Sequence, residues 1–125
     1  MAATSASDTS AITLIIGSDK AYTVELADTQ AARELMQRLP ISLRMADLNS
    51  NEKYGDLAKP LPTASRSIGT IHTGDLMIFT STCLVLFYKD FRTSYRYTPI
   101  GRVAGAETLP EALGKGDVYI TLQAK

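Results

Sequence analysis

The feature that most constrains the fold is the stretch CLVLFYK, residues 83–89, which is apolar on both faces of an extended chain. One face carries Cys83, Val85 and Phe87, and the other carries Leu84, Leu86 and Tyr88. A strand with two apolar faces needs other elements to cover both of its sides. With DLMIFT, residues 75–80, it forms the strongest strand pair in the sequence. We therefore expect a central strand at 83–89.

Six further segments have the composition and alternation of short strands. Residues 12–16 and 22–26 flank the turn residues GSDK and predict a β-hairpin. The remaining four are residues 41–46, 68–72, 98–105 and 117–123. Between residues 47 and 67 the periodicity is weak, and we expect a long loop there, of the kind that is usually either functional or mobile.

Two segments predict short helices. TQAARELMQRL, residues 29–39, places its apolar residues at helical spacing, with Asp28 as the expected N-cap and Pro40 as the stop. LPEAL, residues 109–113, follows a T-x-x-E capping box formed by Thr108 and Glu111, and Gly114 can end it.

The fold class is therefore mainly β, with about eight strands and two short helices. A small closed or nearly closed eight-stranded barrel is the economical arrangement, because closure leaves no exposed strand edges. At 125 residues, with no internal linker or repeat, residues 12–125 form a single domain. Residues 1–11, MAATSASDTSA, are small and polar and are expected to be an unstructured leader.

Composition excludes several classes of protein. Thirteen basic and thirteen acidic residues cancel, so no overall field attracts nucleic acid. No run approaches the roughly 18 apolar residues of a membrane span, and no secretory signal is visible. A single cysteine excludes an internal disulfide, which leaves the cytoplasm as the default compartment. We expect neither a nucleic-acid partner nor a membrane partner.

Four stretches together resemble a family of small bacterial cyclophilin-like proteins: LRMADLNSNEKYGDL, IGTIHTGDLMIF, LVLFYKDFRTSYRYTPIGRV and GDVYITL. The resemblance runs from about Ile12 to Leu122 and implies an eight-stranded β-barrel with helices over its ends. It implies no activity, since the family is named for its fold. Cyclophilins that isomerise X-Pro bonds carry F-H-R and Q-G-G-D stretches and a tryptophan, and none of these occurs here. No catalytic residue is carried over.

The segment DLNSNEKYGDL begins with D-x-N-x-N, the start of a calcium-binding loop. Such a loop needs glycine at its sixth position and glutamate at its twelfth, where this chain has Glu52 and Ala58. The flanks are not helical either. Asn and Asp are ordinary turn residues, so a turn is favoured and no metal is expected. No cofactor is expected, because the partial glycine motif GKGDVY follows a helix and leads into a strand.

The segment YKDFRTSYRYTPIGR interleaves basic and aromatic side chains. Such a pattern can bind single-stranded nucleic acid, but a strand with one packed and one solvated face is favoured at zero net charge. Near the rim of a barrel the same residues suit a ligand or peptide groove. Cys83 is expected to be a buried small hydrophobe, and a catalytic pair with His72 has no support.

We therefore predict that the chain binds a small ligand or peptide at the barrel rim, through Arg44, Tyr54, Phe87, Tyr95 and Arg96. Arg44 anchors a carbonyl or carboxylate if its strand face lines the barrel mouth, and is a surface cation if that face meets solvent. The alternative is a peptidyl-prolyl isomerase with a diverged site, in which Arg44 polarises the prolyl carbonyl. A third hypothesis is an interaction domain without a pocket.

Overall fold

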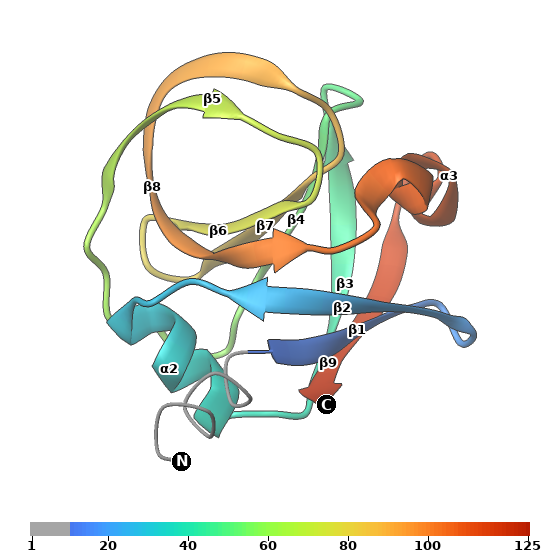
Figure 1. The fold of residues 1–125 in the computed structure, drawn as a ribbon, viewed down its shortest axis with the longest axis horizontal. Coiled ribbons are helices and arrows are strands. Elements are labelled where there is room, and N and C mark those ends of the chain that lie inside the picture. Colours follow the sequence, from blue (N-terminus) through green and yellow to red (C-terminus); the bar gives the residue numbers. More distant parts are fainter. Residues whose placement is uncertain (1–10) are drawn as a thin grey trace.

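The computed structural model describes residues 11–125, which form nine strands, two α-helices and one 3₁₀ turn (Figure 1). In chain order these are β1 (Ala11–Ile16), β2 (Lys20–Leu26), α2 (Gln30–Gln37), β3 (Ile41–Leu48), β4 (Glu52–Asp56), β5 (Arg66–Ile71), β6 (Asp75–Phe79), β7 (Cys83–Phe87), β8 (Phe91–Val103), η1 (Ala106–Thr108), α3 (Leu109–Leu113) and β9 (Val118–Ala124).

The strands form one antiparallel sheet whose order is β2-β1-β9-β3-β4-β7-β6-β8-β5. A further pairing of β2 with β8 closes the first eight of these strands into a ring. β5 is the ninth strand and pairs with β8 alone, beside the ring. The prediction of a mainly β chain with a closed eight-stranded arrangement and two short helices is confirmed.

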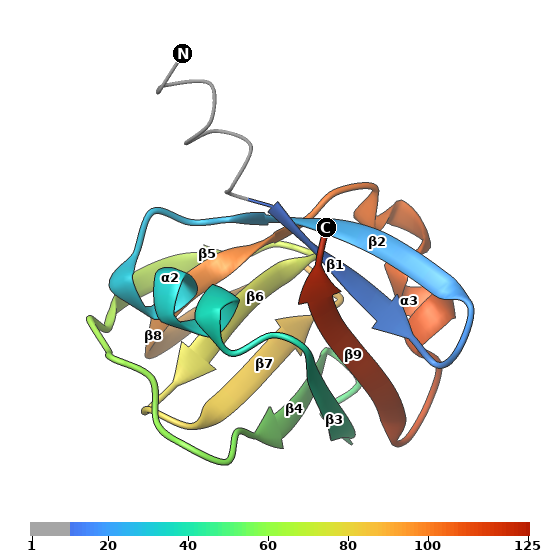
Figure 2. The same cartoon turned by 90° about the horizontal axis from the view of Figure 1, so that it is seen from below.

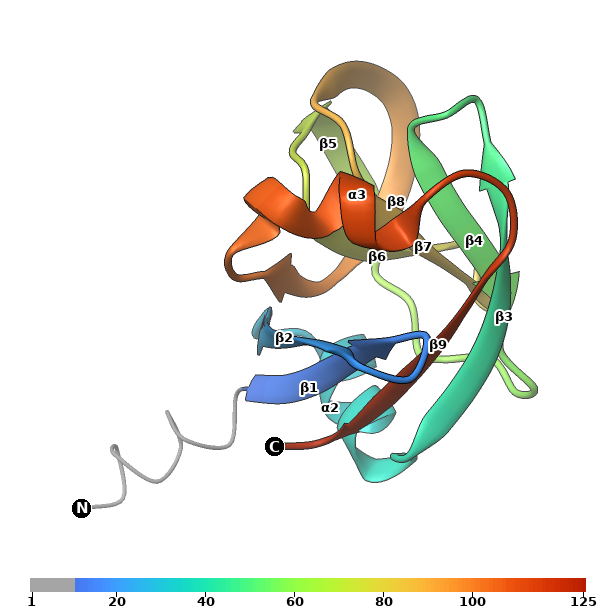
Figure 3. The same cartoon turned by 90° about the vertical axis from the view of Figure 1, so that its right-hand side faces the viewer.

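The main core contains side chains from the ring strands and from both helices. Its twenty buried residues include Ile12, Leu14, Leu35, Leu84, Leu86, Leu109 and Leu122. The helix α2 lies on the left of the molecule and α3 on the right in Figures 1 and 2, and in Figure 3 α2 lies below α3. Each helix buries its apolar face against the ring strands, so the helices complete the core.

A smaller apolar cluster lies on the other face of β6 and β7. Its buried members are Ile71, Met77, Val85, Phe87 and Tyr97. β5 and the first half of β8 supply part of this cluster and so cover the face that β7 turns away from the main core. β7 lies between β4 and β6 with both faces packed, which confirms the prediction of a central, doubly covered strand.

The predicted long loop at 47–67 is wrong in part, because β4 lies within it. β3 and β4 form a hairpin whose turn residues Asn49 and Ser50 have φ values of 57° and 54°. This left-handed pair makes a tight turn, in which the Asn51 amide donates to the Leu48 carbonyl at 3.2 Å, and Asn51 is the third residue between the paired Leu48 and Glu52. The D-x-N-x-N pattern is therefore the end of one strand and the turn into the next.

Asp47 at this turn joins a buried polar network. Its carboxylate accepts hydrogen bonds from the Tyr88 hydroxyl and the Ser50 amide and forms an ion pair with Lys53 at 3.1 Å. The bond from Tyr88, followed by those from Lys53 and Ser50, holds the pKa of Asp47 below its usual value. In the same contact, burial and the Asp47 carboxylate raise the pKa of Tyr88 to about 12.

Three details of the predicted elements differ. The N-cap of α2 is Thr29 and not Asp28: its hydroxyl accepts from the Ala32 amide at 3.1 Å and donates to the Pro99 carbonyl at 2.9 Å. The capping box at Thr108 does not form, because that hydroxyl bonds to the Tyr22 hydroxyl at 2.8 Å. β8 begins at Phe91, well before the expected start at residue 98.

The leader predicted at residues 1–11 lies outside the described residues, apart from Ala11, which begins β1. In residues 11–125 no helix has the length and apolar character needed to cross a membrane.

Candidate functional site

A cavity of about 640 Å³ opens between the β3–β4 turn and the first half of β8. We call it the aromatic cavity, because five rings from β4, β6 and β8 line it. It is lined by Leu48, Asn49, Asn51, Glu52, Tyr54, Phe79, Cys83, Val85, Phe91, Arg92, Thr93, Ser94, Tyr95 and Tyr97. Its volume lies within the range of about 300–1,000 Å³ that small-molecule sites occupy.

Exposed apolar side chains gather at this cavity. The described residues expose five large ones, and four of them line it: Leu48, Tyr54, Phe79 and Tyr95, with 37–63% of each side chain exposed. Single exposed apolar residues are ordinary on a protein surface, whereas a contiguous group marks a site of contact with something else. The surface is therefore apolar where the cavity opens.

The aromatic wall is held in place by the smaller core cluster. The Phe79 ring lies edge-on to Tyr95 at 5.9 Å and tilted against Tyr97 at 5.5 Å. Tyr97 and Phe91 in turn pack on the fully buried Phe87 at 5.5 and 5.7 Å. These edge and tilted contacts are favoured for aromatic pairs, so the exposed rings rest on a fixed base.

Polar and titratable groups occur among these rings. Burial, followed by the nearby Asp47 carboxylate, raises the pKa of Glu52. Burial also raises the pKa of the Cys83 thiol, and Asp56 and Glu52 add to this effect. Burial of the Tyr97 side chain raises the pKa of its hydroxyl to about 12. Arg92 is exposed on β8 and contributes the cavity's one cationic side chain.

The structure brings two of the five predicted site residues into the lining of this cavity, Tyr54 and Tyr95. Phe87 lies beneath them in the core cluster. Arg44 lies outside the lining, 75% exposed, and pairs with Asp117 at 3.2 Å. Arg96 also lies outside it, and donates to the Ser65 carbonyl at 2.8 Å. Joint binding by these five residues stays a prediction.

Sequence reasoning missed Phe79, Glu52 and Arg92 as lining residues. The signal for Phe79 was the alternation within DLMIFT, which puts residues 75, 77 and 79 on one face. Glu52 was assigned to a loop, so its strand face was not considered. Cys83 was expected to be buried, and is instead partly exposed in the cavity wall.

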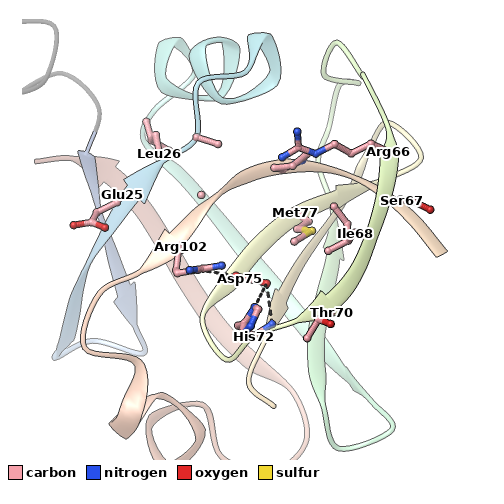
Figure 4. A pocket seen from close by; sticks show the side chains of 13 residues that line it. Glu25, Leu26, Arg66, Ser67, Ile68, Thr70, His72, Asp75, Met77 and Arg102 are labelled. Carbon is pink, nitrogen blue, oxygen red and sulfur yellow. Dashed lines mark hydrogen bonds and ion pairs between the residues drawn. The ribbon is translucent and has the colours of Figure 1, made fainter. Parts of the chain in front are cut away.

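A second cavity, also of about 640 Å³, lies between β2, β5, β6 and β8 (Figure 4). We call it the polar cavity, because Arg66, His72, Asp75 and Arg102 line it. The two cavities share no lining residue, so His72 and Cys83 are in different sites. Within residues 11–125 no three His, Cys, Asp or Glu side chains are grouped so as to hold a metal ion.

Comparison with known proteins agrees with this architecture. The sequence model of the Cyclophilin-like family matches residues 14–123, nearly the whole chain. The chain belongs to the Cyclophilin-like family. This cyclophilin-like chain is also similar to the solution structure of the hypothetical protein AF2241 from Archaeoglobus fulgidus, with a TM-score of 0.67 and 15% identity over 95% of this chain and 97% of that one. At this identity the similarity establishes the fold alone. No curated protein matches the cyclophilin-like chain.

Proposed function

We propose that the aromatic cavity binds a small ligand or short peptide that carries a flat apolar group. The observation that carries the proposal is the gathering of four of the five large exposed apolar side chains around one cavity. Covering those rings with a ligand removes apolar surface from water, which favours binding. Because their supporting contacts already exist in the free protein, little order has to be created on binding.

The rings and polar groups of the wall together suit a peptide with an aromatic or prolyl side chain. Tyr54, Phe79 and Tyr95 offer ring faces and edges to the flat group. Arg92 offers donors to a peptide carbonyl, and Glu52 offers an acceptor to a peptide amide. A wall with both kinds of polar group suits the peptide backbone, which has one donor and one acceptor in most residues.

The test is a titration with the capped peptide acetyl-Ala-Pro-Phe-amide, followed by the backbone amide shifts of the ¹⁵N-labelled chain. We expect shifts at the residues of the aromatic cavity and a loss of affinity of about tenfold or more in Tyr95→Ala, since stacking on a ring contributes about 1–3 kcal/mol. Tyr119→Ala is the matched control, because Tyr119 is similarly exposed at 56% and lines neither cavity. Equal affinities for Tyr95→Ala and the wild type would refute this site.

The single cysteine gives an independent measurement. Cys83 lies in the wall, so a bound peptide should slow its alkylation by iodoacetamide. The raised pKa of this thiol makes the reaction slow, and an alkaline buffer brings it into a convenient range. An alkylation rate that is unchanged at saturating peptide would argue against occupancy of the cavity.

Peptidyl-prolyl isomerisation is the second candidate. An isomerase with a diverged site needs a cation near the prolyl carbonyl, and the guanidinium that lines the cavity belongs to Arg92 and not to the predicted Arg44. A protease-coupled assay with a prolyl peptide tests this. Acceleration that Arg92→Ala abolishes and Arg44→Ala preserves would support isomerisation at this site. A rate equal to the uncatalysed one would exclude it.

A further inference from the structure

The polar cavity contains a buried carboxylate that is fully engaged by its neighbours. The Asp75 side chain is 4% exposed, and its Oδ1 accepts a hydrogen bond from Arg102 Nε at 2.9 Å. Its Oδ2 accepts from the His72 amide at 2.9 Å and lies 4.0 Å from His72 Nδ1. Asp75 therefore fixes the Arg102 side chain and the backbone at His72 (Figure 4).

This arrangement leaves the outer end of Arg102 available. Asp75 takes the Nε–H, and the Arg102 side chain is 61% exposed, so its terminal nitrogens are accessible from solvent. A guanidinium carries five N–H donors in a fixed plane. Holding one edge of that plane on a buried carboxylate orients the remaining donors and reduces the entropy lost when they bind an anion.

An irregularity in the backbone directs Arg102 to this face of the sheet. In the β6–β8 pairing, Asp75 is opposite Arg102 and Leu76 is opposite Gly101, but Met77 is opposite Pro99. One extra residue of β8 is therefore accommodated between these pairs, as in a β-bulge. Side chains of a regular strand alternate, so in a strand of the same sequence without the bulge Arg102 and Pro99, three positions apart, would point to opposite faces. With it, both line the polar cavity.

A second guanidinium reaches the cavity from the ninth strand. Arg66 on β5 is exposed, and its side chain forms no hydrogen bond or ion pair with any of residues 11–125. Ile68 and Met77 lie between it and the Asp75–Arg102 pair and give this part of the wall an apolar surface (Figure 4). The cavity thus has two separated cationic groups with apolar side chains between them.

The charges of the lining favour a monoanion. Asp75 neutralises Arg102, while Arg66 has no acidic partner in the described residues. Glu25 also lines the cavity and is opposite Arg102 in the β2–β8 pairing, but it forms no ion pair with any of residues 11–125 (Figure 4). A carboxylate carries one charge and matches the planar guanidinium, whereas a phosphate dianion brings more negative charge than Arg66 alone can balance.

We propose that the polar cavity binds a small organic carboxylate, whose anionic group lies between Arg66 and Arg102 and whose hydrocarbon body covers Ile68 and Met77. Arg66 and Arg102 are the binding residues, and Asp75 is a positioning residue that acts through Arg102. The site is independent of the aromatic cavity, because the two share no lining residue.

The test is a titration with benzoate, followed by backbone amide shifts. We expect shifts at residues of the polar cavity and an affinity lower by about tenfold or more in Arg66→Met, which loses one charge-assisted contact. Arg33→Met is the control, because it removes the same charge from an exposed arginine that lines neither cavity and should bind benzoate as the wild type does. The Arg66 side chain is exposed and forms no hydrogen bond or ion pair with any of residues 11–125, so this variant is expected to fold, whereas Arg102→Met strips a buried carboxylate of its partner.

Two further ligands test whether the polar cavity requires a carboxylate group. Benzyl alcohol has the same ring without the charge, and should shift these amides far less than benzoate at equal concentration. Inorganic phosphate should bind more weakly than benzoate. Equal responses to benzoate and benzyl alcohol, tighter binding of phosphate, or unchanged benzoate affinity in Arg66→Met would each overturn the proposal. Failure of the peptide titration at the aromatic cavity would leave these outcomes unaffected.

Discussion

Lys53 on β4 is a lysine with no exposed surface, and its replacement by methionine should be among the most damaging conservative changes in the ring. Its ammonium donates to the carbonyl oxygens of Gly114 and Gly116, at 2.8 and 2.6 Å, and pairs with Asp47 at 3.1 Å. These bonds attach β4 to the segment between α3 and β9. Methionine fills a similar volume without any of them.

The expected loss of stability is the sum of the interactions that the ammonium makes, less the cost of its desolvation. Each hydrogen bond from the charged amine contributes about 1.5 kcal/mol, at the lower end of the usual range, because both glycines lie at the surface and water can partly replace it. The ion pair adds about 1 kcal/mol, since the Asp47 side chain is 22% exposed and partly screened. Methionine avoids the desolvation of the ammonium, which offsets about 1 kcal/mol. We expect Lys53→Met to lower the free energy of unfolding by about 3 kcal/mol.

Urea unfolding followed by circular dichroism measures this loss. With a denaturant dependence of about 1.5 kcal/mol per molar urea, the midpoint should fall by about 2 M. Lys115→Met is the matched control: that lysine lies between the same two glycines and is exposed, so its midpoint should change little. A Lys53→Met midpoint equal to or above that of the wild type would refute the role assigned to the buried amine.

Three other predictions concern ring closure and titration. Gly101→Ala should destabilise by about 2 kcal/mol, because its Cβ would lie 2.4 Å from the Glu25 carbonyl oxygen where β2 meets β8; the thermal midpoint should fall further than in Gly17→Ala, whose glycine has open space around it and bears only the cost of a side chain at its left-handed φ of 65°. Tyr97→Phe should remove one phenol that titrates at about pH 12, seen as a smaller late absorbance rise on alkaline titration. Because the folded pKa of Asp47 is lowered, its contribution to stability is present above the unfolded value of 3.8 and lost as pH falls through the folded pKa; Asp47→Asn should therefore lose less stability than the wild type between about pH 5 and pH 2.

The sequence predicted the strands whose core-facing positions are apolar. β7 was identified correctly because both of its faces are apolar, and the hairpin of β1 and β2 because turn residues separate two alternating runs. β4 was missed because its core-facing positions are not apolar. Its inward positions are Lys53 and Gly55, one a buried cation and the other packed against Leu43, so no apolar alternation marks the strand.

The candidate site was predicted less completely. Tyr54 and Tyr95 were chosen as aromatic residues in polar surroundings, and they line one cavity. Their partner Phe79 comes from β6, which lies beside β8 and is separated from β4 by β7 alone, and which strands adjoin depends on topology rather than on local pattern. The polar cavity was not foreseen at all, because no spacing in the sequence indicates that Asp75 and Arg102 are opposite each other.

The extra residue in β8 makes the face that Arg102 occupies a matter of strand pairing as much as of composition. A related chain that kept every residue but paired regularly through this stretch would turn its arginine toward the apolar interior and its valine toward solvent, because a shift of one position exchanges the faces of a strand. A related chain that lacked one residue of the bulge would pair regularly and keep both side chains on their present faces. In comparing relatives, a gap of one residue at this point of an alignment is therefore compatible with the proposed carboxylate site, whereas loss of either arginine is not.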